Sequence, residues 1–381
     1  MVHLNLSVLL GLLSGAAALP GRALQPEHSG GIGLDTAAAS APAPESAAAR
    51  KLSRRRYGGE LKRDISLWAE MARRTPTARP RGASQLIAAN ISLPKDFTWA
   101  DHDGINFLTP QRNQHIPRYC GSCWAFASTS VLADRWNVRQ HKETPSRAFK
   151  PVLLSVQSVL SCGNEINGCG TCEGGDDAKV YELAATHGLV HQACSEYMAM
   201  DTKCGDMIGF DHATGMESRP PCYNCDEKNR CWVIQNHKRL WSTQAYAIDG
   251  EDAMMQEIRE HGPIACAIMA TDKMEHDFGP NCMSPPPANS VHAANGAHCI
   301  TGTFMEALPD SDARINHVVE VVGWGTDQHN NDYWTIRNSW GTEWGDQGFM
   351  NIVRDSNKGP LGTGNNLLET QCGAARVLRY E

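Results

Sequence analysis

The sequence predicts an α+β protein of two lobes, a helical lobe followed by one rich in β-strands, with a cleft between them. Before Trp241, apolar residues recur at helical spacing in three stretches, 123–137, 153–160 and 176–186. Asp176 or Asp177 can cap the third helix, and Gly188 can end it. After Trp241, a short helix is followed by apolar, β-prone runs; these segments are 252–260, then 264–269, 317–324, 333–337 and 348–353.

The N-terminus has the features of a signal peptide. Residues 8–19 form a short apolar run that ends in small residues, and the run is too short to span a bilayer. The alternative is a buried N-terminal helix, which the Ala- and Pro-rich stretch that follows disfavours. We therefore expect a signal peptide over 1–19, no membrane span elsewhere and no nucleic-acid partner, since the net charge is -7.

The next stretch differs in composition from the rest of the chain. Residues 37–44 are low in complexity, and the basic stretch 51–75 has an uneven apolar stripe that fits a helix. Prolines follow, and Asn90 begins a short glycosylation motif. We expect a partly disordered pro-segment over 20–92. The main folded domain then covers 93–381, with its lobes divided into roughly 110–240 and 241–381.

All 14 cysteines lie at or after Cys120. Such a number is unusual in a reducing compartment, where thiols stay unpaired. The pattern predicts disulfides and a protein of the secretory pathway, placed in a lysosome or vacuole or outside the cell.

Three widely separated residues have the chemistry of a nucleophile, a base and an orienting group. Cys123 begins a helix, and a helix N-terminus stabilises the thiolate that attacks. His317 begins a strand and Asn338 ends another. Only the fold can bring a Cys, a His and an Asn so far apart in sequence together. A disulfide Cys, a core His and a turn Asn are the alternatives, each plausible only when taken singly.

The motifs Cys-Gly-Ser-Cys123-Trp, His317-Val-Val and Asn338-Ser-Trp-Gly, in this order, resemble the active site of papain-like cysteine peptidases. The similarity runs from about Leu93 to Cys372. It implies a helical left lobe, a β-barrel right lobe, peptide or protein substrates, no cofactor or metal, a monomer and possible inhibition by cystatin-like proteins. It further implies roles for these three residues and for six others. Cys123 is the nucleophile, His317 the base, Asn338 the residue that orients the base and Gln114 the oxyanion donor, and the substrate-binding residues are His115, Tyr119, Gly174, Gly175 and Trp340.

A small insertion points to one branch of this family. Eight residues separate Gln114 from Cys123, three more than is usual in the family. The extra His115-Ile-Pro resembles a loop of the cathepsin X (cathepsin Z) branch, in which the His binds the carboxylate at the substrate's C-terminus. The resemblance therefore implies a carboxypeptidase that removes one C-terminal residue at a time, with the imidazole charged in an acidic compartment. An inserted loop with His115 merely exposed is the alternative.

Other features depart from this branch. The pro-segment has no Cys to cover Cys123, and Phe126 stands where the branch often has His. His317 lies about 190 residues after Cys123, where papain-type enzymes have about 130–150. The extra length is expected in two stretches, 194–231 and 273–311.

The resemblance also implies the disulfides. They are Cys120–Cys172, Cys162–Cys204, Cys194–Cys222, Cys225–Cys231 and Cys266–Cys372. Cys282 and Cys299 can pair with each other, which leaves Cys169 over. A zinc site at Cys222, Cys225 and Cys231, with His237 nearby, is a minority alternative.

Three functional hypotheses remain open at this point. The first is a cysteine carboxypeptidase, and the second is a papain-like endopeptidase or a dipeptidase of cathepsin B type. The third is an inactive binding protein on the same scaffold. The intact set of five site residues argues against the third: Gln114, Cys123, His317, Asn338 and Trp340.

Overall fold

The computed structural model describes residues 62, 65–74, 93–145, 148–204, 222–228, 230–234, 236–279, 302–306, 308, 314–354 and 364–381. The expected signal peptide, most of the expected pro-segment, Asn90, Cys282 and Cys299 lie outside these residues. All structural statements below concern the described part of the chain.

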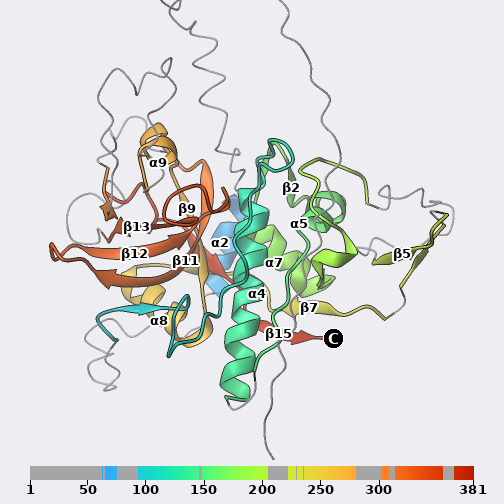
Figure 1. Ribbon diagram of the computed structural model, residues 1–381, viewed down its shortest axis with the longest axis horizontal. Helices are drawn as coiled ribbons and strands as arrows, with labels where there is room; N and C mark the ends of the chain where they lie inside the picture. Colours follow the sequence, from blue (N-terminus) through green and yellow to red (C-terminus); the bar gives the residue numbers. More distant parts are fainter. Residues whose placement is uncertain are drawn as a thin grey trace, which may run out of the picture. The chain divides into compact units, whose positions relative to one another are not determined.

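A mixed sheet of eight strands forms one half of the molecule (Figure 1). Its order is β10 (Thr303–Phe304), β13 (Phe349–Val353), β12 (Asp332–Arg337), β11 (His317–Thr326), β9 (Ile264–Ile268), β14 (Cys372–Ala374) and β8 (Tyr246–Ile248), with β1 (Phe97–Thr98) also paired to β11. All pairings are antiparallel except that of β10 with β13. The α+β class is therefore confirmed. Among the described strands the pairing is an open path from β10 to β8, where the resemblance implied a barrel.

The central strand β11 is buried over almost its whole length. A strand covered on both faces needs a continuous apolar run, and four valines of 318–322 supply it. Helix α4 (Cys123–Glu143) packs against β11 and lies between the sheet and the helices of the other half (Figure 1). Helix α8 (Glu251–His261) also contacts β11. The strand that begins at His317 is thus held between helices.

The other half contains short helices and a small sheet. The helical segments are α5 (Val156–Ser158), the π-helix Val159–Gly163, α6 (Asn164–Asn167), α7 (Asp177–Thr186) and the 3₁₀ turn Gln192–Cys194. The small sheet has the order β15 (Val377–Tyr380), β7 (Arg239–Ser242) and β4 (Leu189–Val190), and two hairpins add β2 (Gly170–Thr171) with β3 (Gly174–Gly175) and β5 (Tyr223–Cys225) with β6 (Cys231–Val233).

The predicted helices are present with shifted ends. Helix α4 continues to Glu143, beyond the expected end at 137. The helix expected at 153–160 begins only at Val156, because Leu154 is extended and forms a β-bridge with His191. Asp176 caps α7 by accepting a hydrogen bond from the Ala178 N–H at 3.0 Å, as predicted.

The predicted strands also occur within two residues of the expected bounds. In addition the structure contains α9 (Asp272–His276), which overlaps the start of the stretch 273–311. Within the described residues, no helix is long and apolar enough to cross a bilayer.

Both ends of the stretch 93–381 cross between the halves of the fold. Strand β1, near residue 97, pairs with β11 in the large sheet, and β15, near the C-terminus, pairs with β7 in the small one. The predicted lobe boundary at residue 241 assigns each segment by its position in the sequence, so it does not predict which sheet β15 joins. Two apolar cores are present: one contains most of the buried apolar residues of α4 and α7, and the other contains most of those of the large sheet and α8.

Four disulfides join described residues: Cys120–Cys172, Cys162–Cys204, Cys194–Cys222 and Cys266–Cys372. These are four of the five implied pairings. The side chains of Cys225 and Cys231 are outside the described set, although their backbones lie opposite each other in the β5–β6 hairpin. Cys123 and Cys169 are not in disulfides.

Candidate active site

The predicted nucleophile Cys123 is the first residue of α4 and is buried. The chain leading to it is fixed by the Cys120–Cys172 disulfide and by the Gly121 N–H, which donates to the Cys172 carbonyl at 2.7 Å. Trp124 then donates from its indole nitrogen to the Gly121 carbonyl at 3.1 Å. A thiol at the start of a 21-residue helix lies at the positive end of the helix dipole, which favours the thiolate.

His317 and Asn338 are joined by a hydrogen bond of 2.8 Å between Nε2 and Oδ1. Because Nε2 is engaged in this bond, Nδ1 is the ring nitrogen left for proton exchange. Trp340 stacks on the imidazole with ring centroids 4.8 Å apart. Burial lowers the pKa of His317 to about 4; the Asn338 bond opposes this shift and the charge of His115 adds to it. The imidazolium therefore needs a nearby negative charge, such as a thiolate.

Asn338 is itself held on three sides. The Ser339 N–H donates to Asn338 Oδ1 at 2.7 Å, and Gln111 Nε2 donates to the Asn338 carbonyl at 2.6 Å. The Asn338 N–H donates to the Gly348 carbonyl at 3.0 Å. The amide is consequently placed before any substrate arrives.

Gln114 is fully buried and bonded on both ends of its side-chain amide. Ser339 Oγ donates to Gln114 Oε1 at 2.6 Å, and Gln114 Nε2 donates to the Cys120 carbonyl at 3.0 Å. A second N–H on the same nitrogen remains for an oxyanion. Tyr197, which the sequence did not point to, donates to the Gln114 carbonyl at 2.6 Å and lies 2.8 Å from the Ser122 hydroxyl.

The loop after Gln114 brings His115 to the same region. Its imidazole stacks on Tyr119 with centroids 4.9 Å apart and planes only 8° from parallel. The His115 N–H donates to Asn113 Oδ1 at 2.8 Å, and Asn113 Nδ2 donates to the Trp340 carbonyl at 2.9 Å. Since His115 also acts on the pKa of His317, the loop and the predicted base are electrostatic neighbours.

Gly174 and Gly175 form the short strand β3. A Cβ on Gly175 would overlap the Trp124 ring and the Cys169 carbonyl, so only glycine fits there. The Gly175 carbonyl accepts a hydrogen bond from the Lys62 N–H at 3.1 Å. This backbone group is therefore able to pair with another extended segment of chain.

Two predictions concerning cysteines have different outcomes. The zinc alternative loses a ligand because Cys222 is bonded to Cys194, and the described residues contain no group of three or more His, Cys, Asp and Glu that could hold a metal ion. Cys169, which the pairing left over, is buried; its Sγ donates to Asn167 Oδ1 at 2.9 Å, and burial raises the pKa of this thiol.

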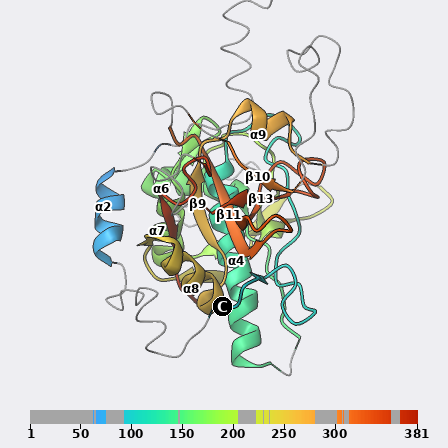
Figure 2. The same cartoon turned by 90° about the vertical axis from the view of Figure 1, so that its left-hand side faces the viewer.

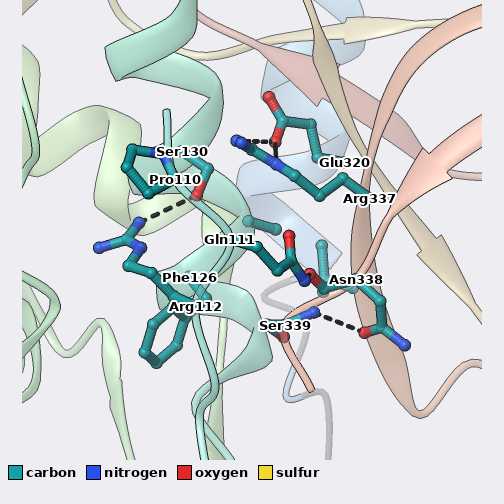
Figure 3. Close-up of a pocket in the computed structure, with 11 residues that line it drawn as sticks. Pro110, Gln111, Arg112, Phe126, Ser130, Glu320, Arg337, Asn338 and Ser339 are labelled. Atoms are coloured by element: carbon teal, nitrogen blue, oxygen red, sulfur yellow. Dashed lines mark hydrogen bonds and ion pairs between the residues drawn. The ribbon is translucent and has the colours of Figure 1, made fainter. Parts of the chain in front are cut away.

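Sequence reasoning missed a buried ionic cluster next to Asn338 (Figure 3). Arg337 contacts Glu320 of β11 and Asp134 of α4, and all three side chains are buried. The sequence did contain a sign of this cluster, because Asp134 and Glu320 are charged residues inside the apolar runs 131–138 and 317–324. Arg112 lies nearby, and its guanidinium covers the Phe126 ring, the departure noted above, at 4.9 Å.

Comparison with known proteins gives a consistent result. The family described as papain family cysteine protease matches residues 93–376. Cathepsin Z of Onchocerca volvulus is 35% identical over 282 residues, which cover 74% of this chain and 76% of that protein. Cathepsin B-like protease 1 of Arabidopsis thaliana is 30% identical over 247 residues, covering 63% of this chain and 53% of that protein.

A solved structure supports the fold. The one described as "Structural basis for the limited antibody cross reactivity between the mite allergens Blo t 1 and Der p 1" superposes with a TM-score of 0.53 at 22% identity, covering 86% of this chain and 81% of that chain. The family match spans most of the chain and agrees with this fold. The chain therefore belongs to the papain family of cysteine proteases.

Proposed function

We propose that the protein is a cysteine carboxypeptidase that removes single C-terminal residues, similar to cathepsin Z. Cys123 is the nucleophile, His317 the base and Asn338 the group that orients it. Gln114 and the Cys123 N–H stabilise the oxyanion, at about 3 kcal/mol per donor. The observation that carries the proposal is the position of His115 on a loop that is hydrogen bonded, through Asn113, to the segment containing Trp340.

The geometry of this loop suits a carboxylate. Stacking on Tyr119 restricts the rotation of the His115 ring, so that its charged form is presented in one orientation. The adjacent Ile116 is 63% exposed and projects from the loop. An imidazolium fixed near the scissile bond favours a substrate that ends there in a negative charge. An internal peptide bond offers no such charge at that point.

The test uses one peptide in two forms, with a free C-terminal carboxylate and with a C-terminal amide. Mass spectrometry of the products over time is expected to show stepwise loss of single residues from the acid and little cleavage of the amide. His115→Ala is expected to lower kcat/KM about tenfold or more on the acid and to leave the amide nearly unchanged. His329→Ala, at an exposed loop position, is the matched control.

Other product patterns identify the alternatives. Release of dipeptides supports a cathepsin B type of activity, and internal fragments support an endopeptidase. Equal loss of activity on the acid and the amide in His115→Ala contradicts a carboxylate anchor. Cys123→Ser is expected to abolish turnover of both peptides. Failure of a thiol-directed covalent probe to label Cys123 supports the inactive-scaffold alternative.

We also propose that residues 20–92 act as a pro-segment. Figure 2 shows helix α2 (Ile65–Arg74) at the outer edge of the fold. The helix packs against β8, and Trp68 donates to Asp176 Oδ1 at 3.3 Å. Met71 is fully buried, and a Cβ on Gly373 would meet its Cε. The Lys62 N–H also donates to the carbonyl of Gly175, a residue predicted to bind substrate, and this bond supports a blocking role for the segment.

The pro-segment proposal predicts that removal of residues 1–92 increases kcat/KM on the acid peptide. Met71→Asp in the full chain is expected to increase it in the same way, because a charge is costly at a buried site. No change on removal contradicts a blocking role. We propose in addition that residues 1–19 are a signal peptide that directs the chain into the secretory pathway. The enzyme then acts as a monomer, and cystatin-like proteins can inhibit it.

A further inference from the structure

A single guanidinium, that of Arg337, joins three elements of the fold. Its Nε donates to Glu320 Oε2 at 2.8 Å, its Nη2 lies 2.6 Å from Asp134 Oδ2, and its Nη1 donates to the Thr109 carbonyl at 2.6 Å. Arg337 is 4% exposed, Glu320 1% and Asp134 0%. Contacts of this kind are strong and directional because little water competes for them.

These three elements are the ones that carry the proposed catalytic residues. Asp134 belongs to α4, which begins at Cys123, and Glu320 belongs to β11, which begins at His317. Arg337 ends β12 and directly precedes Asn338. Figure 3 shows the Arg337 and Glu320 side chains side by side, close to Asn338 and Ser339. Asp134 links Arg337 to the nucleophile helix, and Glu320 links it to the strand of the base.

Glu320 also bears on the register of that strand. Glu320 and Arg337 are direct partners in the antiparallel pairing of β11 with β12. The pairing is irregular between Val321 and Gly323, just beyond this pair. The ionic pair therefore lies between the irregularity and the His317–Asn338 bond. A slip of one residue would turn Asn338 to the other face and break that bond.

The surroundings of the Glu320 carboxyl group indicate a structural hydrogen-bonding role. Burial raises its pKa well above the usual value, and the negative charge of Asp134 adds to this, while Arg337 opposes it. The buried guanidinium of Arg112 also interacts electrostatically with Asp134 and Glu320. Glu320 and Arg337 help to line a cavity of about 10 Å³, which holds at most a single water molecule and is too small for a ligand. The cluster is thus packed, and Glu320 acts as a hydrogen-bonding partner of Arg337.

We propose that Glu320 is a positioning residue of the active site, which holds the His317 strand in register with Asn338 through Arg337. This inference rests on the proposed roles of Cys123, His317 and Asn338. It goes beyond them because Glu320 touches neither the substrate nor the reacting atoms.

The experiment compares Glu320→Leu with Glu320→Gln in the enzyme from which residues 1–92 have been removed. The quantity compared is kcat per active site, with the active sites counted by titration with an irreversible thiol inhibitor. Leu cannot bond Arg337, so kcat is expected to fall about tenfold or more with KM little changed. Gln keeps the shape and an acceptor oxygen, and is expected to retain most of kcat. The rate of Cys123 alkylation by iodoacetamide is followed against pH, and its acid limb is expected to move to higher pH in Glu320→Leu only.

Glu369→Leu is the matched control. Glu369 is another buried glutamate that contacts β12, where it accepts from Trp334 Nε1 at 2.8 Å, but it does not contact Arg337. Its replacement is expected to lower the melting temperature while kcat per site and the alkylation profile stay unchanged. A merely structural role for Glu320 predicts the same pattern for Glu320→Leu, and that result overturns the proposal.

Two further outcomes are informative. If Glu320→Leu does not fold, Arg337→Lys tests the same bond from the other side, since it keeps the positive charge but removes the Nε group that donates to Glu320 Oε2 at 2.8 Å. It is then expected to lower kcat with KM little changed, and unchanged kcat overturns the proposal. Turnover by Cys123→Ser contradicts the proposed function, whereas a normal Glu320→Leu beside an inactive Cys123→Ser contradicts only the role of Glu320.

Discussion

At the residue scale, the site depends on an imidazole that is buried yet must carry a charge. Burial lowers the pKa of His317 to about 4, because the charged ring is poorly solvated. Asn338 opposes the shift by accepting a hydrogen bond from the ring, and Trp340 covers one face of it. A thiolate at Cys123 would supply the compensating charge. Each group therefore depends on the others for its ionisation state.

The role of Asn338 gives a direct prediction. In Asn338→Ala the imidazole loses its fixed partner and can rotate away from the thiol, so kcat is expected to fall about 10- to 100-fold with KM little changed. Steady-state kinetics with sites counted by thiol titration measure this. An Asn338→Ala enzyme with wild-type kcat would mean that the 2.8 Å bond has no part in catalysis.

At the scale of elements, backbone contacts position the site as much as side chains do. Strand β3 contains only Gly174 and Gly175, and its neighbour β2 begins with Gly170. The absence of side chains lets this hairpin lie against the Trp124 ring, one residue after the nucleophile. The π-helix Val159–Gly163 similarly allows the helical segment to continue into α6.

Gly175→Ala tests this close packing. The new methyl group would overlap the Trp124 ring and the Cys169 carbonyl, neither of which can move freely. We expect a loss of about 2–3 kcal/mol in the free energy of unfolding, measured by denaturant titration. Gly104→Ala is the control: its φ is +76° with open space around it, so only backbone strain of about 1 kcal/mol is expected. Equal losses in the two variants argue against the packing explanation.

At the scale of the whole molecule, buried acidic groups make the stability depend on pH. Burial, with a further contribution from Asp272, raises the pKa of Glu275 from 4.5 to about 8. Its side chain is 10% exposed, and its Oε2 lies 3.7 Å from Nε2 of His276. The folded protein holds this proton more tightly than the unfolded chain does. The associated stability is complete below about pH 4.5 and is lost as the pH rises toward 8.

Glu275→Gln is expected to remove this dependence, because the amide does not titrate. The melting temperature of the variant should exceed that of the wild type by a few degrees near pH 8 and equal it near pH 4.5. Thermal melts across this range provide the measurement. Glu227→Gln, at an exposed position, is the control and should follow the wild type. A difference between Glu275→Gln and wild type that is the same at both pH values contradicts a titrating Glu275.

The sequence by itself determined the elements and the types of residue in the site. Helical spacing predicted α4, α7 and α8, and β-prone runs predicted β9, β11, β12 and β13, because burial of one face or of a whole strand leaves a local pattern. The start of a helix at Cys123 and the positions of His317 and Asn338 at strand ends were also readable locally. So was the inserted His115, through a resemblance of motifs.

Only the tertiary structure decided which of these residues meet. The bond between His317 and Asn338 and the contact of Tyr197 with Gln114 join positions that no local pattern relates. The Arg337 cluster is the clearest case, since Asp134 and Glu320 read as isolated charges in apolar runs until the pairing of β11 with β12 and the packing of α4 bring them to one guanidinium. Sequence periodicity reports which face of an element is buried, whereas partners are set by the path of the whole chain.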